Sequence, residues 1–187
     1  DLRDTDAIEE AFGTIRAARG GVDVLVNNAG MGRNAPLTEG ATEDWRAMLE
    51  INVLALCVCT REAVRDMRSR GDVGHVIHIG SMAGHRVPGA SGVYSASKFA
   101  VRSLTEGLRQ ELRAADSGVR VTAISPGFVE TEFAERYHGD EEAARRTYGR
   151  FPCLTSDDVA RSVRFVLASP SHVQFHDLLV RPTQQRS

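Results

Sequence analysis

The stretch Val22-Asp23-Val24-Leu25-Val26-Asn27-Asn28-Ala29-Gly30 joins a short, valine-rich apolar run to a polar loop that ends in glycine. A run of this length and composition is typical of a buried strand in a parallel sheet. Asn and Gly fit the loop, because both tolerate the backbone conformations of tight turns. The same pattern recurs where residues 75–79 lead into Gly80-Ser81 and residues 119–124 lead into Pro126-Gly127. The sequence therefore predicts three similar strand–loop units.

Helix signals separate these runs. Amphipathic helices are predicted over about residues 4–19, 42–70, 93–115 and 155–168, and Leu178–Val180 predicts a last strand. Strands that alternate with helices imply an α/β fold, a parallel sheet with helices on both faces. Ligands of such sheets bind beyond the carboxyl ends of the strands, and Asn28, Ser81 and Gly127 each fall at such an end.

A reactive pair is predicted on the helix over residues 93–115. Tyr94 and Lys98 are four residues apart, so they share one face of that helix. A nearby ammonium favours the phenolate, and it would lower the pKa of Tyr94 from its usual value of about 10. Such a phenol can exchange a proton with an alcohol or carbonyl at neutral pH. Ser81 lies thirteen residues upstream and adds a hydroxyl to the same end of the sheet.

Composition narrows the classes of partner. The 187 residues suit one domain, and 23 basic residues balance 25 acidic ones without a basic stripe, so no nucleic-acid partner is predicted. No apolar run reaches the roughly 20 residues of a membrane span. The three cysteines form no disulfide framework, which favours a reducing, cytoplasmic setting. His75 and His78 would face opposite sides of a strand, so no metal site is predicted.

Five segments together carry a family resemblance: Asn27-Asn28-Ala29-Gly30, Ile51-Asn52-Val53, Gly80-Ser81-Met82-Ala83-Gly84, Tyr94-x-x-x-Lys98 and Ser125-Pro126-Gly127. In this order and spacing, the chain resembles the short-chain dehydrogenase/reductase family over its whole length. The resemblance implies a Rossmann-like doubly wound parallel sheet in one domain that covers residues 1–187. It also implies an NAD(P)(H)-dependent oxidoreductase that interconverts a secondary alcohol and a ketone or aldehyde.

One family feature is not found in these residues. Family members bind the cofactor pyrophosphate on a Gly-rich turn after their first strand, and no Gly-x-x-x-Gly-x-Gly follows a strand here. Asp1-Leu2 is interpreted as the end of the third strand of the complete fold. About 60 residues, or two βαβ units, are therefore expected to precede it. The chain is interpreted as a partial domain, the C-terminal two-thirds, which lacks the first strands.

The resemblance assigns catalytic roles to four residues. Tyr94 would be the general acid in carbonyl reduction and the base in alcohol oxidation. Lys98 would lower the pKa of Tyr94 and bond the nicotinamide ribose. Ser81 would donate a hydrogen bond to the substrate oxygen. Asn52 would hold a water molecule that links Lys98 to a proton relay.

The resemblance also assigns cofactor contacts. It places Asp1 at the adenine and the loop Asn28-Ala29-Gly30 near the ribose and adenine side. It places Pro126 and Gly127 against the nicotinamide, whose carboxamide the backbone of Val129 and the hydroxyl of Thr131 would bond.

A segment over about residues 128–152 is expected to cover the substrate and to contain one helix of its own. It holds five of the eleven aromatic residues, which favours a small apolar carbonyl or alcohol substrate. The alternative is that these rings only pack the underside of the segment. Three stretches resemble a subgroup that uses NADP(H) and acts on ketosteroids or isoprenoid alcohols: His85-Arg86-Val87, residues 105–112 and Arg181-Pro182-Thr183-Gln184. NADP(H) is therefore favoured over NAD(H).

The activity of the chain, its oligomeric state and the role of His85 stay open at this level. The chain could be a catalytically inactive fragment that acts at most as a binding or dimerisation module. Family members commonly pair through their long helices, so the resemblance also implies a homodimer or homotetramer. His85 would either bond a distal polar group of the substrate or face solvent.

Overall fold

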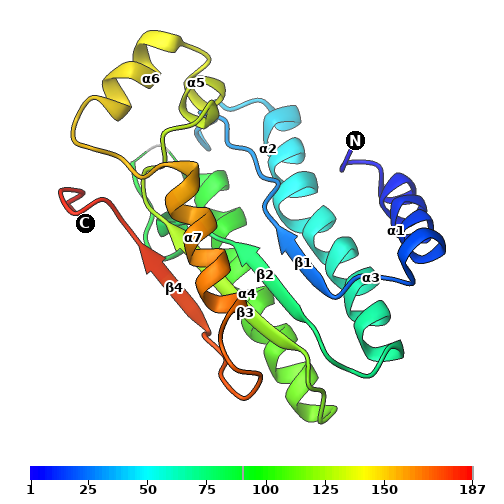
Figure 1. Cartoon of the computed structure of the whole chain (residues 1–187). Helices are drawn as coiled ribbons and strands as arrows, with labels where there is room; N and C mark the ends of the chain where they lie inside the picture. Colours follow the sequence, from blue (N-terminus) through cyan, green and yellow to red (C-terminus); the bar gives the residue numbers. More distant parts are fainter. Residues whose placement is uncertain (90, 187) are drawn as a thin grey trace.

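A computed structural model describes residues 1–89 and 91–186. It contains four strands, β1 (Val24–Asn27), β2 (His75–Ile79), β3 (Arg120–Pro126) and β4 (Asp177–Val180). They form one sheet in the order β1-β2-β3-β4, and every neighbouring pair is parallel (Figure 1). The predicted α/β class with a parallel sheet is confirmed, and the predicted strands shift by only a few residues.

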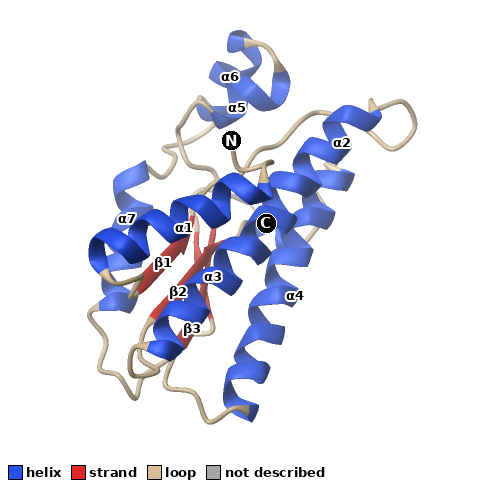
Figure 2. Ribbon diagram, turned by 90° about the vertical axis from the view of Figure 1, so that its right-hand side faces the viewer, coloured by secondary structure: helices blue, strands red, loops and turns tan. Residues whose placement is uncertain are grey.

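Helices cover both faces of this sheet. They are α1 (Thr5–Arg19), α2 (Thr42–Leu49), α3 (Ala55–Ser69), α4 (Gly92–Ala114), α5 (Phe133–His138), α6 (Glu141–Tyr148) and α7 (Ser156–Leu167), with a short 3₁₀ turn η2 (Met82–Gly84). Figure 2 shows α3 and α4 on one side of the sheet and α7 on the other. None of the helices in the described part of the chain combines the length and the apolar character needed to cross a bilayer.

The core is divided by the sheet, because successive side chains of a strand point to opposite faces. Val76 and Val121 pack with α1, α3 and α4 in one cluster that also holds Phe12, Met67 and Leu112. Ile77 and Ile124 pack with α7 around Val166 in the other. This two-sided packing buries β2 and β3 and so holds their carboxyl ends in place.

The helix predicted over residues 42–70 is interrupted. A π-helical turn, η1 (Glu50–Leu54), separates α2 from α3. Asn52 lies in this turn and is fully buried, with hydrogen bonds to residues from two other segments. Single π turns of this kind occur mostly inside α-helices and often at functional sites. Periodicity alone does not reveal the turn, because it accompanies long-range contacts.

The segment over residues 128–152 contains two short helices, not the single helix that was predicted. Gly139 ends α5 with a left-handed backbone conformation (φ 66°), which favours glycine. Asp140 then starts α6 by accepting hydrogen bonds from the backbone of Glu142 and Ala143. Figure 1 places both helices beyond the carboxyl ends of the strands, and we call residues 128–152 the lid.

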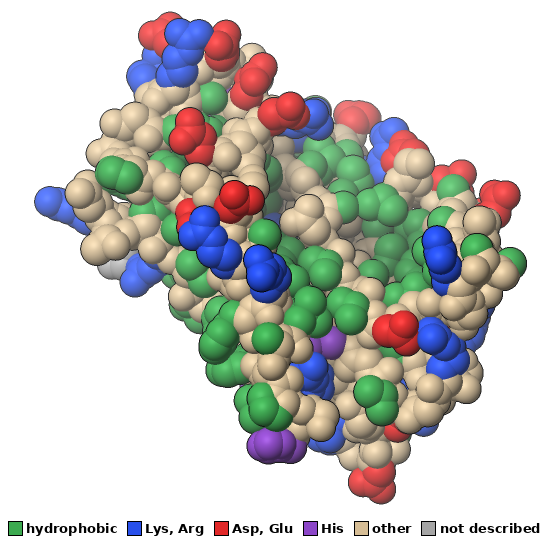
Figure 3. Space-filling view, in the orientation of Figure 1, with side chains coloured by type: hydrophobic (Ala, Val, Ile, Leu, Met, Phe, Trp, Pro, Cys, Tyr) green, Lys and Arg blue, Asp and Glu red, His purple; other side chains and the backbone are tan. Residues whose placement is uncertain are grey.

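Strand β1 lies at one edge of the sheet. Its Val24 and Val26 point to the same face, and 43% and 38% of their surfaces are exposed. The face of the molecule in Figure 3 is hollowed, and apolar side chains line the hollow. Among the described residues, no helix covers this face of β1 as α7 covers β3.

Candidate active site

A cavity of about 980 Å³ opens at the carboxyl ends of the strands, beneath the lid. It brings together most of the residues that the sequence singled out from separate segments: Asn28, Gly30, Ser81, Tyr94, Lys98, Pro126, Gly127, Val129 and Thr131. Asn52 lies just behind this wall, since a Cβ on Gly30 would sit 3.3 Å from its amide oxygen. Ala29 is exposed outside the cavity, and Asp1 is an exposed residue that pairs with Arg3.

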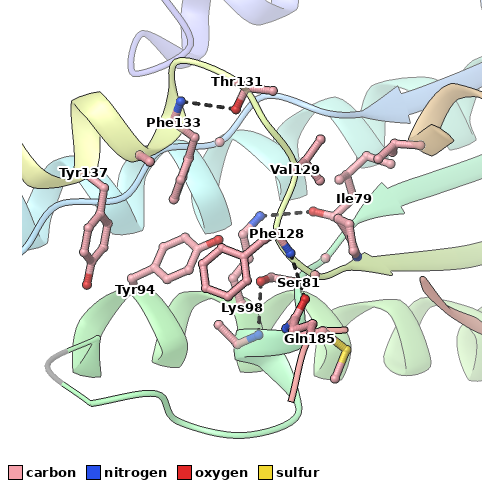
Figure 4. Close-up of a pocket in the computed structure, with 18 of the residues that line it drawn as sticks. Ile79, Ser81, Tyr94, Lys98, Phe128, Val129, Thr131, Phe133, Tyr137 and Gln185 are labelled. Carbon is pink, nitrogen blue, oxygen red and sulfur yellow. Dashed lines mark hydrogen bonds between the residues drawn. The ribbon is translucent and has the colours of Figure 1, made fainter. Parts of the chain in front are cut away.

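The reactive groups come from the end of β2 and the start of α4. Ser81 leaves β2 and caps η2, where its hydroxyl accepts a hydrogen bond of 3.1 Å from the backbone of Ala83. Tyr94 and Lys98 lie one turn apart near the start of α4. Figure 4 shows the phenol of Tyr94, the hydroxyl of Ser81 and the ammonium of Lys98 around one space below the lid. The predicted juxtaposition of these three groups is therefore present.

Lys98 is a buried cation with few partners. Only 7% of its surface is exposed, and its ammonium donates a 3.1 Å hydrogen bond to the carbonyl of Ile79. No described carboxylate forms an ion pair with it. Burial lowers the pKa of Lys98 to about 8. An ammonium has three N–H donors, so the hydroxyls of a ribose would find donors here. This fits the nicotinamide cofactor that the sequence implies.

Tyr94 behaves differently from the prediction. The expectation that Lys98 lowers its pKa is wrong for this structure, because burial raises the pKa of Tyr94 to about 12. Hydrogen bonding with Ser81 lowers this pKa but is outweighed by the burial. Lys98 turns its ammonium to the carbonyl of Ile79 instead, so it does not offset the effect of burial on Tyr94. At neutral pH the phenol therefore holds its proton.

The rings of the lid explain this burial. The Tyr94 ring lies 5.4 Å from that of Phe133 and 6.1 Å from that of Tyr137, measured between ring centroids. Both lid rings rest on Gly32, where a Cβ would come within 2.7 Å of each. Four of the five lid aromatics line the cavity, while Phe151 packs on Phe128 from outside it. The rings thus form an apolar wall and do not only fill the lid's underside.

Three hydrogen bonds within the protein hold the Asn52 side chain. Its amide accepts from the backbone N–H of Met31 and donates to the carbonyl of the same residue, both at 2.8 Å. It also donates to the hydroxyl of Ser97 at 2.9 Å. These bonds fix the loop that follows β1 against the Tyr-bearing helix α4. In this structure the Asn52 side chain therefore holds these two segments in place.

The turn after β3 offers free backbone groups. Leu154 bonds the carbonyl of Phe128 and the N–H of Glu130 on either side of Val129. The N–H and C=O of Val129 lie between these two bonds and have no hydrogen-bond partner within residues 1–89 and 91–186. Thr131 accepts from the backbone of Phe133 at 3.2 Å, which leaves its own hydroxyl proton available. This arrangement suits a ligand that both donates and accepts, as a carboxamide does.

Two polar clusters near the site were not predicted. His85 lies 3.2 Å from both Ser125 and Asp177, and Ser125 donates to Asp177 at 2.9 Å, so the loop after η2 is tied to β4. Its side chain is only 16% exposed, so the alternative that His85 faces solvent is wrong. His78 is buried between Thr60 and Thr105, and burial lowers its pKa to about 4. Their partners are distant in sequence, so no local pattern reveals them. Over the described residues, no group of His, Cys, Asp or Glu is arranged to hold a metal ion.

Gln185 was also missed. It lies in the C-terminal tail, only 9% exposed, and it lines the cavity next to the start of the lid. Its carbonyl oxygen accepts a 3.0 Å hydrogen bond from the backbone of Phe128. The sequence offers one indirect signal, the glycine at position 127, which this side chain approaches closely.

Comparison with known proteins places this geometry in a family. The family model described as short chain dehydrogenase matches residues 1–142. "Dehydrogenase/reductase SDR family member 11" of Bos taurus is 50% identical over 189 residues, covering 99% of this chain and 74% of the relative. "Farnesol dehydrogenase" of Aedes aegypti is 38% identical and is covered to 74% by the whole chain. The solved closed form of serine dehydrogenase complexed with NADP+ superposes with a TM-score of 0.94 at 37% identity, covering 100% of this chain and 75% of that one. These matches confirm the resemblance drawn from the sequence, and the chain belongs to the short-chain dehydrogenase/reductase family.

Proposed function

We propose that this chain carries the catalytic and substrate-binding part of an NADP(H)-dependent oxidoreductase. The reaction would interconvert a secondary alcohol and a ketone or aldehyde. The observation that carries this proposal is the meeting of Tyr94, Ser81 and Lys98 in one cavity at the carboxyl ends of the strands. Family membership supports the same chemistry.

The roles of the residues follow from their protonation. Ser81 donates a hydrogen bond to the substrate oxygen and so stabilises the negative charge that develops there during reduction. Tyr94 keeps its proton at neutral pH, because its pKa is raised to about 12, and it gives this proton to the oxygen. The bound nicotinamide supplies the hydride in reduction and accepts it in oxidation. Lys98 would hold the ribose with the donors that Ile79 leaves free.

The cofactor contacts are proposed on the same basis. Val129 and Thr131 would bond the carboxamide, while Pro126 and Gly127 would lie against the nicotinamide ring. Asn28, Ala29 and Gly30 would approach the ribose and adenine side, and Asp1 the adenine. NADP(H) is preferred over NAD(H), with support from the subgroup resemblance and from a structural neighbour solved with NADP+.

The substrate is proposed to be a small apolar carbonyl or alcohol compound, steroid-like or isoprenoid-like. The apolar lid wall of Phe128, Phe133 and Tyr137 supports this class. One relative is named a farnesol dehydrogenase, which fits an isoprenoid alcohol. A homodimer or homotetramer in a reducing, cytoplasmic compartment is proposed as its setting. The three free cysteines support the choice of compartment.

Replacement of Tyr94 tests the function. In the full-length protein, Tyr94→Phe should lower turnover of ketones with NADPH by about 10²–10⁴-fold, because the proton donor is lost while the ring remains. Ser81→Ala should lower kcat through the loss of the hydrogen bond to the oxygen. Ser103→Ala is the matched control, since Ser103 is exposed on α4 away from the cavity. Near-normal turnover by Tyr94→Phe would favour the alternative, an inactive binding or dimerisation module.

A further inference from the structure

We propose that Gln185 is a specificity-determining residue of the cavity. Its amide N–H₂ group would donate a hydrogen bond to a substrate oxygen other than the one that reacts. The preferred substrates are then carbonyl or alcohol compounds with a second oxygen acceptor, such as a second ketone. This inference rests on the proposed oxidoreductase function and narrows its substrate class.

The C-terminal tail is built into the wall of the cavity. The backbone of Gly127 donates to the carbonyl of Val180 at 2.7 Å, which joins the turn after β3 to the end of β4. Pro182 is buried, and Arg86 from the loop after η2 donates to the carbonyl of Arg186 at 3.4 Å. These contacts hold the tail on both sides of Gln185. Figure 4 shows the Gln185 side chain reaching to the backbone of Phe128 at the cavity.

The Phe128 contact fixes which way the amide faces. A backbone N–H can only donate, so the oxygen of Gln185, and not its nitrogen, must face Phe128. The approach is close: a Cβ on Gly127 would lie 2.1 Å from this oxygen. Only glycine at position 127 accommodates the side chain in this orientation. The N–H₂ group is thereby directed away from Phe128.

This N–H₂ group has no acceptor in the described part of the chain. Gln185 is only 9% exposed, and its remaining surface lines the cavity, so a bound ligand that displaces water there must satisfy this donor or leave it unpaired. The cavity lining includes no Asp or Glu in the described residues, so no carboxylate of the wall competes for the donor. The lid side of the cavity is mainly aromatic. An oxygen of a bound ligand would be an acceptor within the cavity for this donor.

The unpartnered donor of Gln185 also predicts how strongly the cavity discriminates between substrates with and without a second oxygen. A site built around a polar partner rejects an analogue without it, because the buried donor is then left unsatisfied. The penalty for such a donor corresponds to about a tenfold or larger difference in affinity. Compounds that differ only in the second oxygen should therefore be separated by this factor.

A matched pair of substitutions tests the donor. Gln185→Glu keeps an oxygen for the N–H of Phe128, removes the N–H₂ donor and adds a negative charge. Gln184→Glu makes the same change of charge on the exposed neighbour. Dissociation constants of 2-nonanone, 2,6-nonanedione and 2,8-nonanedione are measured by calorimetry on the full-length protein with NADP+, which cannot reduce them. Turnover of the same ketones with NADPH is followed in parallel.

We expect at least one dione to bind the wild type about tenfold more tightly than 2-nonanone. Gln185→Glu should lose this preference, and Gln184→Glu should keep it. The inference is overturned if no dione is preferred, if Gln185→Glu keeps the preference, or if it weakens 2-nonanone as much as the diones. Should Gln185→Glu fail to fold, Gln185→Met must lose the preference. Absence of turnover with every ketone would refute the proposed function separately, since the binding data do not depend on it.

Discussion

Lys98 is a residue that destabilises the folded protein at neutral pH and is proposed to bind the cofactor. The charged form of a buried ammonium is disfavoured, and burial alone lowers its pKa from 10.5 to about 8. The ammonium has a single carbonyl partner at 3.1 Å and no ion pair among the described residues. Folding therefore carries an electrostatic cost at neutral pH, and a bound ribose would reduce it. A cost of this kind is typical of residues that are retained for their chemistry.

Replacement of Lys98 should reveal this cost. A pKa that is lower in the folded state than in the unfolded state contributes stability above the unfolded value, near pH 10.5, and loses it as the pH falls through 8. Below pH 8 the cost is about 3 kcal/mol, from the shift between 10.5 and about 8. Lys98→Met should thus raise the free energy of unfolding at pH 7 by about 2 kcal/mol, after loss of the hydrogen bond to Ile79. The gain should vanish by about pH 10.

Urea unfolding at both pH values measures this effect. Arg102→Met is the matched control, because Arg102 is an exposed cation of the same helix and should change little at either pH. A loss of stability at pH 7 in Lys98→Met would show that the buried ammonium is better compensated than its contacts indicate.

The role of Asn52 follows from its long-range hydrogen bonds and is not evident from its residue type alone. Its three hydrogen bonds join the Met31 backbone to Ser97 across the buried side of the site. The sequence resemblance singled it out, yet no local pattern shows that both of its amide N–H donors already have acceptors. Any water bound by this side chain would therefore have to donate to its amide oxygen, which has one acceptor site left.

At the scale of elements, the lid and α4 together set the proton affinity of the phenol. Phe133 of α5 lies against Tyr94, and burial is the largest cause of the raised pKa of Tyr94. Lid position and acid strength are therefore linked: a lid that opens exposes the phenol and makes its proton easier to lose. Reduction, which needs the proton in place, is favoured with the lid closed.

Removal of the Phe133 ring should loosen this link. We expect Phe133→Ala to lower the pKa of Tyr94 from about 12 toward 10, because solvent then reaches the phenol. Ultraviolet titration of tyrosinate measures it, and the Tyr94→Phe variant identifies the signal. Phe99 is an exposed ring on α4, the helix that carries Tyr94, and Phe99→Ala should leave the pKa of Tyr94 unchanged. An unshifted value in Phe133→Ala would mean that the buried environment does not depend on the lid.

The elements that sequence reasoning predicted well are those with local causes. The capping box of Thr155 and Asp158 starts α7 as expected, and the apolar runs became β2 and β3. The π turn and the orientation of Lys98 were missed, because they depend on side chains from distant segments. The pKa of Tyr94 was predicted with the wrong sign, since helical spacing reports neighbours along α4 but not the rings that cover it.

At the scale of the whole molecule, the sheet orders the chemistry. Every strand pair is parallel, so the loops after β1, β2 and β3 all leave at the same end. That is why segments separated by many residues line one cavity. The tail after β4 reaches the same end and brings Gln185 there. Topology alone therefore predicts where a site lies, while side-chain contacts decide what it selects.

The uneven cover of the sheet has its own consequence. Strand β1 forms one edge, and its Val24 and Val26 are 43% and 38% exposed on one face. Unpaired edges with apolar side chains promote association between chains.

The 187-residue chain of 20.4 kDa should therefore self-associate, increasingly so at higher concentration. Size-exclusion chromatography with light scattering measures its mass. Val24→Lys should shift the chain toward monomer, because a lysine on an edge strand opposes pairing, whereas Val73→Lys, in the exposed loop before β2, should not. A mass that is independent of concentration and unchanged in Val24→Lys would show that β1 is not a contact surface.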